Sequence, residues 1–219
     1  MRIAILLYEG LTALDAVGPY EVLALVPGAR VQFVAREPGP KRTDTGFLAL
    51  TADYALSDVP RPDIIVVPGS SNSTAEPMRD PATLDWLRSA HEATRWTTSV
   101  CSGALVLAAA GLLRGKRAAT HWAAAPHLAQ FGAEYAAERF VEDGKIITAA
   151  GVSAGIDMAL HLAARVAGEE EAQVIQLLTE YDPRPPFDAG SMKKATPEVA
   201  ERAARRMAEL ASRERARSS

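Results

Sequence analysis

The stretch TTSVCSGALVLAAAGLL, residues 97–113, contains the features that decide the fold. It holds Cys101, the only cysteine among 219 residues. Small and β-branched residues lead into this cysteine, and a run of small and apolar residues with helical spacing follows it. Ser99 and Gly103 lie two residues before and after Cys101, and small residues at these positions allow a strand to turn sharply into a helix. The stretch therefore predicts a strand, a tight turn at the cysteine and a helix.

This stretch alone leaves two interpretations of Cys101 open. A nucleophile on the turn would lie at a helix N-terminus, where free N–H groups and the helix dipole favour the thiolate. The backbone N–H of Ser102 would then be placed to donate to an oxyanion. A structural cysteine would instead be a small buried side chain, since free cysteine is among the most buried residue types. The loose pattern favours neither interpretation.

Strand-like and helix-like segments alternate along the rest of the chain, which predicts an α/β fold. The alternation is typical of a doubly wound, mostly parallel sheet with helices on both faces. The predicted strands are 2–7, 31–35, 47–51, 63–67, 96–100, 117–121, 139–142 and 145–149. The predicted helices are 14–25, 81–94, 103–112, 122–131, 154–167 and 169–181, with a last helix over about 196–213 that Thr196 caps. Because no repeat or low-complexity linker divides the chain, we expect one domain over residues 1–219.

In sheets of this kind, ligands bind outside the carboxyl ends of the strands, and three such ends carry unusual residues. Gly69 and Ser70 follow the apolar strand 63–67, where they form either an anion-binding loop or an ordinary turn. Asp15 stands in an apolar stretch after the first strand, as the cap of a helix over 18–25 or as a carboxyl group with a raised pKa. His121 ends the predicted strand 117–121 and has either a structural role or a place in the site.

Composition excludes several classes of function. The net charge of −3 gives no overall field that would favour nucleic acid. One cysteine cannot form an intramolecular disulfide, and the apolar runs are too short for a signal peptide or a membrane span. The histidines, cysteine and acids lack the spacing of metal ligands. We therefore expect a cytoplasmic protein that binds neither nucleic acid nor membranes and has no metal site.

Five ordered segments together resemble the ThiJ/PfpI superfamily, whose members are related to class I glutamine amidotransferases. These segments are LTALDAVGPYEVL, VVPGS, SVCSGALVLAAAGLLRGKRAATHW, GVSAGIDMALHL and EYDPRPPFDAGS. They look most like the isonitrile hydratase branch. The resemblance implies a flavodoxin-like fold, usually as a homodimer, with the family's elbow cysteine at Cys101 and its acidic partner at Asp15. Ser102 follows the cysteine where protease-type members carry histidine, which argues against a protease dyad of adjacent residues.

For a small-molecule substrate, the resemblance implies hydration of an isonitrile to an N-substituted formamide through a cysteine thioimidate. Cys101 would add to the isonitrile carbon while a protonated Asp15 supplies a proton, and Asp15 would then activate water. Backbone N–H groups at Gly69, Ser70 and Ser102 would hold developing charge or water, and His121 is assigned to substrate binding. No metal or organic cofactor is expected. The alternatives are a non-catalytic ligand- or redox-sensing domain like that of AraC-type regulators, and a glyoxalase- or deglycase-like enzyme.

Overall fold

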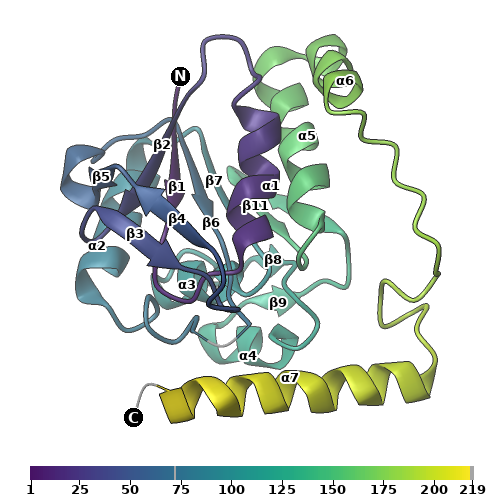
Figure 1. Ribbon diagram of the computed structural model, residues 1–219. Helices are drawn as coiled ribbons and strands as arrows, with labels where there is room; N and C mark the ends of the chain where they lie inside the picture. The colour runs from purple at the N-terminus through teal and green to yellow at the C-terminus, as the bar shows by residue number, and fades with distance from the viewer. Residues whose placement is uncertain (72, 218–219) are drawn as a thin grey trace. The chain divides into compact units, whose positions relative to one another are not determined.

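The computed structural model describes residues 1–71 and 73–217, which divide into two compact units (Figure 1). The first unit is Met1–Thr179 and the second is Glu180–Ser219. The prediction of one domain over the whole chain stays a prediction. Among the described residues, no helix combines the length and the apolar character needed to cross a membrane.

The first unit is built on a seven-stranded sheet of order β10-β11-β7-β6-β1-β2-β5. Neighbouring strands run parallel except β10 and β11, which form an antiparallel hairpin. The strands are β1 (Arg2–Leu6), β2 (Arg30–Ala35), β5 (Tyr54–Ala55), β6 (Ile64–Val67), β7 (Trp96–Val100), β10 (Phe140–Asp143) and β11 (Ile146–Ala149). The predicted α/β class with a mostly parallel sheet is therefore confirmed.

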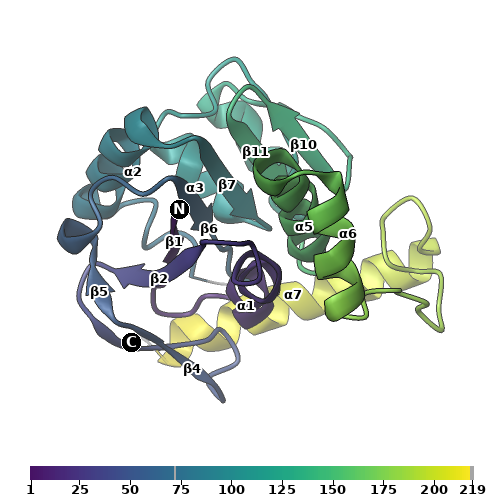
Figure 2. The ribbon, with the colours of Figure 1, turned by 90° about the horizontal axis from the view of Figure 1, so that it is seen from above.

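Helices cover both faces of this sheet, as Figure 2 shows. One face carries α1 (Ala13–Leu23), α5 (Ala154–Ala167) and α6 (Glu169–Leu178), and the other carries α2 (Pro81–Ala93) and α3 (Gly103–Ala109). After β1, the chain passes through α1 to β2, which lies on one side of β1 in the sheet. The later strands β6 and β7 lie on the other side of β1. The order therefore reverses between β1 and β6, and doubly wound folds form their ligand crevice at such a point.

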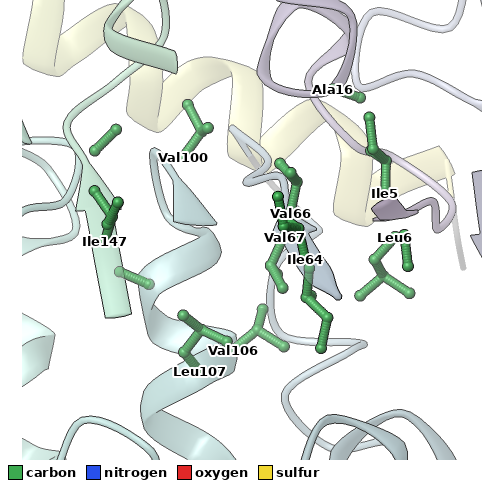
Figure 3. Packing of buried hydrophobic residues seen from close by; sticks show 14 of the residues in the cluster. Ile5, Leu6, Ala16, Ile64, Val66, Val67, Val100, Val106, Leu107 and Ile147 are labelled. Atoms are coloured by element: carbon green, nitrogen blue, oxygen red, sulfur yellow. The ribbon is translucent and has the colours of Figure 1, made fainter. Parts of the chain in front are cut away.

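The core is built from strands that are buried on both faces. All four residues of β6 are buried, in agreement with its uninterrupted apolar sequence. Figure 3 shows Ile64, Val66 and Val67 of β6 between Ala16 of α1 on one side and Val106 of α3 on the other. Because the sheet and its helices form one continuous apolar cluster, the loops at the strand ends start from fixed positions.

Four short segments differ from the sequence-based expectations. The predicted strand 47–51 is β4 (Ala49–Ala52), which pairs with β3 (Gly39–Arg42), a strand the sequence did not indicate. The predicted strand 117–121 is only β8 (Arg117–Ala118), which pairs with β9 (Glu134–Tyr135), and pairing stops where the N–H of Ala119 donates to the Thr148 hydroxyl. The predicted helix 122–131 is reduced to α4 (Ala125–Leu128) and the 3-10 turn η2 (Ala129–Phe131).

The predicted strands 139–142 and 145–149 leave residues 143 and 144 for a hairpin turn, but the turn in the structure lies one residue later. Asp143 pairs with Ile146, so the two turn residues are Gly144 and Lys145. Gly144 has a φ of 64°, which glycine adopts without a Cβ penalty. A further 3-10 turn, η1 (Leu56–Asp58), follows β5.

The second unit contains α7 (Pro197–Arg217). Its N-terminus is capped by Thr196, whose hydroxyl accepts a hydrogen bond from the N–H of Val199 at 3.4 Å. Proline at the first helical position suits the start of a helix, since its missing N–H has no partner there in any case.

Candidate active site

Cys101 lies on a strained turn between β7 and α3. Its φ is 59°, in a region that residues other than glycine rarely adopt. The Cys101 N–H donates to the carbonyls of Ala149 and Ala150, and its own carbonyl accepts from the Thr120 hydroxyl at 2.8 Å. A Cβ at Gly103 would lie 2.1 Å from the Val67 carbonyl oxygen, so only glycine fits there. The predicted elbow is therefore present, with glycine required for close packing.

The thiol of Cys101 is almost completely buried, with 5% of the residue exposed. Burial and the charge of Asp15 raise the pKa of the thiol well above its ordinary value, whereas hydrogen bonds from Ser102 act in the opposite direction. The expected effect of the helix N-terminus is therefore present but outweighed. At neutral pH the resting group is a thiol, which corrects the expectation of a thiolate.

Asp15 lies in the first turn of α1 and is completely buried. Its Oδ2 accepts the Gly69 N–H at 2.9 Å, and its Oδ1 has no hydrogen bond of regular geometry among the described residues. Burial raises the pKa of Asp15 from 3.8 to about 7, while the hydrogen bond from Gly69 and the interaction with the Cys101 side chain limit the rise. Because α1 begins at Ala13, the alternative that Asp15 caps a helix over 18–25 is wrong.

The thiol and the carboxyl form an interacting pair. The interaction between the side chains of Cys101 and Asp15 lowers the pKa of the carboxyl and raises that of the thiol. Asp15 lies on the helix that follows β1 and Cys101 on the turn that follows β7, and these two strands flank β6 in the sheet order. The structure therefore brings together a nucleophile and an acid that are 86 positions apart in the sequence.

The loop after β6 joins this pair to the elbow. Besides the bond from Gly69 to Asp15, the Ser70 N–H donates to the Ser102 hydroxyl, which itself donates to the Ser70 carbonyl, both at 2.9 Å. A Cβ at Gly69 would lie 2.5 Å from the Ser102 nitrogen and 2.9 Å from Cys101 Cβ. Gly69 therefore allows the elbow, rather than only a ligand, to approach the loop. In this resting arrangement the N–H groups of Gly69 and Ser70 already have acceptors.

His121 lies on the other side of the thiol, beyond the end of β8. The Ala123 N–H donates to its Nδ1 at 3.3 Å, and burial lowers the pKa of the ring, so the neutral form with a proton on Nε2 is favoured. A Cβ at Gly151 would lie 2.3 Å from His121 Cδ2 and 3.2 Å from Cys101 Sγ. The His121 ring and the Cys101 sulfur therefore both lie close to the Cα of Gly151, which places His121 beside the Cys101–Asp15 pair.

Sequence reasoning missed three polar residues that surround the site. The Tyr8 hydroxyl donates to the Pro68 carbonyl at 2.9 Å, and burial together with the charges of Asp15 and Cys101 raises its pKa well above the ordinary value. The Thr74 hydroxyl lies 2.6 Å from that of Ser102. Asp44 accepts hydrogen bonds from two hydroxyls, and its charge raises the pKa of Asp15. The position of Tyr8 at the end of a strand could have indicated that it belongs to the site, but no sequence pattern indicated Asp44.

A separate hollow of about 340 Å³ opens near the ends of β1 and β2. Tyr8 is the site residue among those that line it, and the lining includes both acidic and basic side chains: Leu7, Tyr8, Glu9, Arg36, Glu37, Lys41, Glu76, Pro77, Asp80 and Thr83. Within the part of the chain that the structure describes, no three histidine, cysteine or acidic side chains gather as ligands for a metal ion.

Comparison with known proteins places this geometry in context. A model of the DJ-1/PfpI family matches residues 1–165. An isonitrile hydratase of Pseudomonas putida is 44% identical over 208 residues, which cover 95% of this chain and 90% of that protein. A helix-turn-helix transcriptional regulator of Pseudomonas aeruginosa is 31% identical, over 76% of this chain and 50% of the regulator.

A solved structure shares the architecture over almost the whole chain. It is a ThiJ/PfpI family protein from Pseudomonas syringae, 37% identical, with a TM-score of 0.91 over 96% of this chain and 87% of its own. The family expected from the five sequence segments is therefore confirmed by both the family model and the structural match.

Proposed function

Because this chain belongs to the DJ-1/PfpI family, we propose that it is an isonitrile hydratase, which adds water to an isonitrile to give an N-substituted formamide. The observation that carries the proposal is the buried Cys101–Asp15 pair, in which the carboxyl has a pKa of about 7. The 44% identity to an isonitrile hydratase over 95% of the chain supports the reaction class.

The first step follows from where the pair holds its protons. The active form carries one proton, which rests on the sulfur of Cys101 while Asp15 is ionised. Asp15 takes this proton as the sulfur forms a bond to the isonitrile carbon, and then gives the same proton to that carbon. The product is a thioimidate on Cys101. A carboxyl group with a pKa near neutrality suits both transfers, because neither proton state is strongly favoured.

In the second step the carboxylate of Asp15 activates water. Asp15 accepts a proton from water as the oxygen bonds to the thioimidate carbon, and it returns that proton to the nitrogen. The carbon–sulfur bond then breaks, and the hydroxyl proton passes to the sulfur as the formamide leaves. The atoms balance with isonitrile and water alone, so the proposed reaction calls for no metal, oxidant or organic cofactor.

The surrounding groups are assigned roles by their present contacts. The Ser102 N–H, which already stabilises the sulfur, is the best placed of the three proposed donors for charge that develops there. Gly69 and Ser70 would bind substrate or water only by exchanging their present acceptors, and their first role is to hold Asp15 and Ser102. Neutral His121 bounds the space around the sulfur and would contact the substrate. A homodimer and a cytoplasmic location are proposed from the family resemblance.

A second candidate function is supported by the match to half of a transcriptional regulator. In that case the domain senses a ligand or an oxidant and turns over no substrate. Cys101 lies on a strained turn among polar groups, and such a cysteine could be oxidised as well as act in catalysis. The buried thiol reacts slowly with oxidants while it stays protonated.

Parallel assays of the wild-type protein separate these functions. We expect cyclohexyl isonitrile to yield N-cyclohexylformamide, followed by proton NMR, and methylglyoxal to remain unchanged. Formation of lactate from methylglyoxal without any formamide would instead support a glyoxalase-like enzyme. No product from either compound, together with peroxide-dependent gain of oxygen on Cys101 by mass spectrometry, would support the sensor and contradict the hydratase.

A further inference from the structure

Asp44 lies in the turn between β3 and β4 and reaches the site from outside the main sheet. Its Oδ2 accepts hydrogen bonds from the Thr12 hydroxyl at 2.6 Å and the Ser71 hydroxyl at 2.8 Å. Its backbone N–H donates to the Leu11 carbonyl at 3.0 Å, next to a bridge between Leu11 and Thr43. One carboxylate oxygen therefore joins two segments that are distant in the sequence.

Both segments determine the position of Asp15, since one carries it and the other donates a hydrogen bond to it. Thr12 directly precedes α1, which carries Asp15, and the Thr12 N–H donates to the Gly69 carbonyl at 2.9 Å. Ser71 lies two residues after Gly69, whose own N–H donates to Asp15 Oδ2. The carboxylate of Asp44 thus fastens the start of the helix to the loop that binds the acid, and hydrogen bonds to a charged group are the stronger ones.

Asp44 also acts on Asp15 through its charge. The other titratable groups that interact with Asp15 are Cys101 on the elbow and Tyr8 at the end of β1. On α5, which packs against α1, the charged or titratable side chains are paired elsewhere, namely Asp157 with Arg139 and both His161 and Arg165 with Glu142. The negative charge of Asp44 raises the pKa of Asp15 in addition to the effect of burial.

We propose that Asp44 is a positioning residue for Asp15, which fastens α1 to the loop after β6 and places a negative charge near the acid. The inference rests on the proposed function, since it is the hydration reaction that uses Asp15 as a base. Asp44 itself touches no reacting atom and acts through Thr12, Ser71 and its charge.

Three variants separate the charge of Asp44 from its hydrogen bonds. Asp44→Asn keeps an oxygen that accepts from both hydroxyls but removes the charge, whereas Asp44→Ala removes both. Asp53→Asn removes one negative charge from an exposed residue after β4 and is the matched control. Circular dichroism and thermal unfolding of each variant establish that it is folded before its activity is compared.

The readout is the pH dependence of kcat/KM with cyclohexyl isonitrile. Activity of the wild type should rise through the pKa of Asp15, about 7, as the carboxylate forms. Asp44→Asn should move this rise to lower pH by roughly half a unit, with a plateau lowered about twofold at most, because the neutral amide makes weaker hydrogen bonds. Asp44→Ala should show the same shift with a plateau lowered several-fold, and Asp53→Asn should match the wild type. An Asp44→Asn profile that superimposes on that of the wild type overturns the inference.

Alkylation of Cys101 by iodoacetamide tests the inference without turnover. Since Cys101 is the only cysteine, the rate reports on one thiol. The rate should first rise near pH 7, where the Asp15 carboxylate forms and can accept the thiol proton. This rise should be absent in Asp15→Asn. Asp44→Asn should move this rise to lower pH. A shifted alkylation profile in a protein that makes no formamide would contradict only the proposed function, whereas turnover with both profiles unmoved would contradict only the role of Asp44.

Discussion

At the residue scale, the site depends on how Cys101 and Asp15 share protons. The position of each residue after a strand pointed to the correct edge of the sheet, and the family resemblance named them as partners. Their protonation could not be predicted, because it follows from burial and from neighbours that only the folded chain brings together. Asp44 was missed for the same reason, since its partners Thr12 and Ser71 lie about 30 residues away in the sequence.

The buried carboxyl of Asp15 should make stability fall as pH rises. Its pKa is 3.8 in an unfolded chain and about 7 in the folded protein, so between these values the unfolded chain loses the proton first. Stability that is present below pH 4 is therefore lost by about pH 7. Asp15→Asn keeps the shape without the charge, and its gain in unfolding free energy should be roughly 2–3 kcal/mol larger at pH 8 than at pH 5.

Urea unfolding of both proteins at the two pH values measures this difference. Asp53→Asn, which changes an exposed acid, should show no comparable dependence on pH. A stability difference between Asp15→Asn and the wild type that is equal at pH 5 and pH 8 would show that Asp15 is not a buried acid with a raised pKa.

At the element scale, the long elements were predictable and the short ones were not. The central strands and α2, α3 and α5 follow directly from apolar runs and helical periodicity. The hairpin of β3 and β4 was half missed because Gly39 and Pro40 indicate a loop, although glycine and proline are tolerated in a two-stranded sheet at the edge. Since this hairpin carries the turn with Asp44, the element and the residue were missed together.

The elbow depends on glycine at its close contacts, which predicts a large effect of Gly103→Ala. A Cβ there would overlap the Val67 carbonyl oxygen at 2.1 Å and the backbone of Pro68 at 2.9 Å. Because backbone rather than a flexible side chain is in the way, we expect a loss of roughly 2–4 kcal/mol in unfolding free energy.

Chemical denaturation provides the measurement for this variant, and Gly190→Ala provides its control. A Cβ at Gly190 meets no atom within 4 Å, so its effect should stay within about 0.5 kcal/mol. Equal stability of the two alanine variants would mean that α3 does not pack against the end of β6 as described.

At the scale of the whole molecule, alternation of strands and helices was enough to predict the doubly wound sheet. The switch of direction between β1 and β6 explains why residues following β1, β6 and β7 meet at one site. The division of the chain after Thr179 was not predicted, because the segment 180–196 lacks the low-complexity composition of a typical linker.

A chain that ends at Thr179 tests this division. It contains the whole seven-stranded sheet, the helices α1 to α6 and the Cys101–Asp15 pair. We therefore expect it to unfold in one cooperative transition, followed by circular dichroism, with the chain of 219 residues as the reference. A truncated chain without cooperative unfolding would instead support the prediction of one domain over residues 1–219.

The most direct test of the central claim is the rate of formamide formation from cyclohexyl isonitrile by wild type and Cys101→Ala. Cys101 packs at the elbow as a small side chain, so alanine should leave the protein folded, which circular dichroism verifies. The proposed thioimidate predicts formamide from the wild type and none above the uncatalysed rate from Cys101→Ala. Formamide formation by folded Cys101→Ala at the wild-type rate would contradict the account.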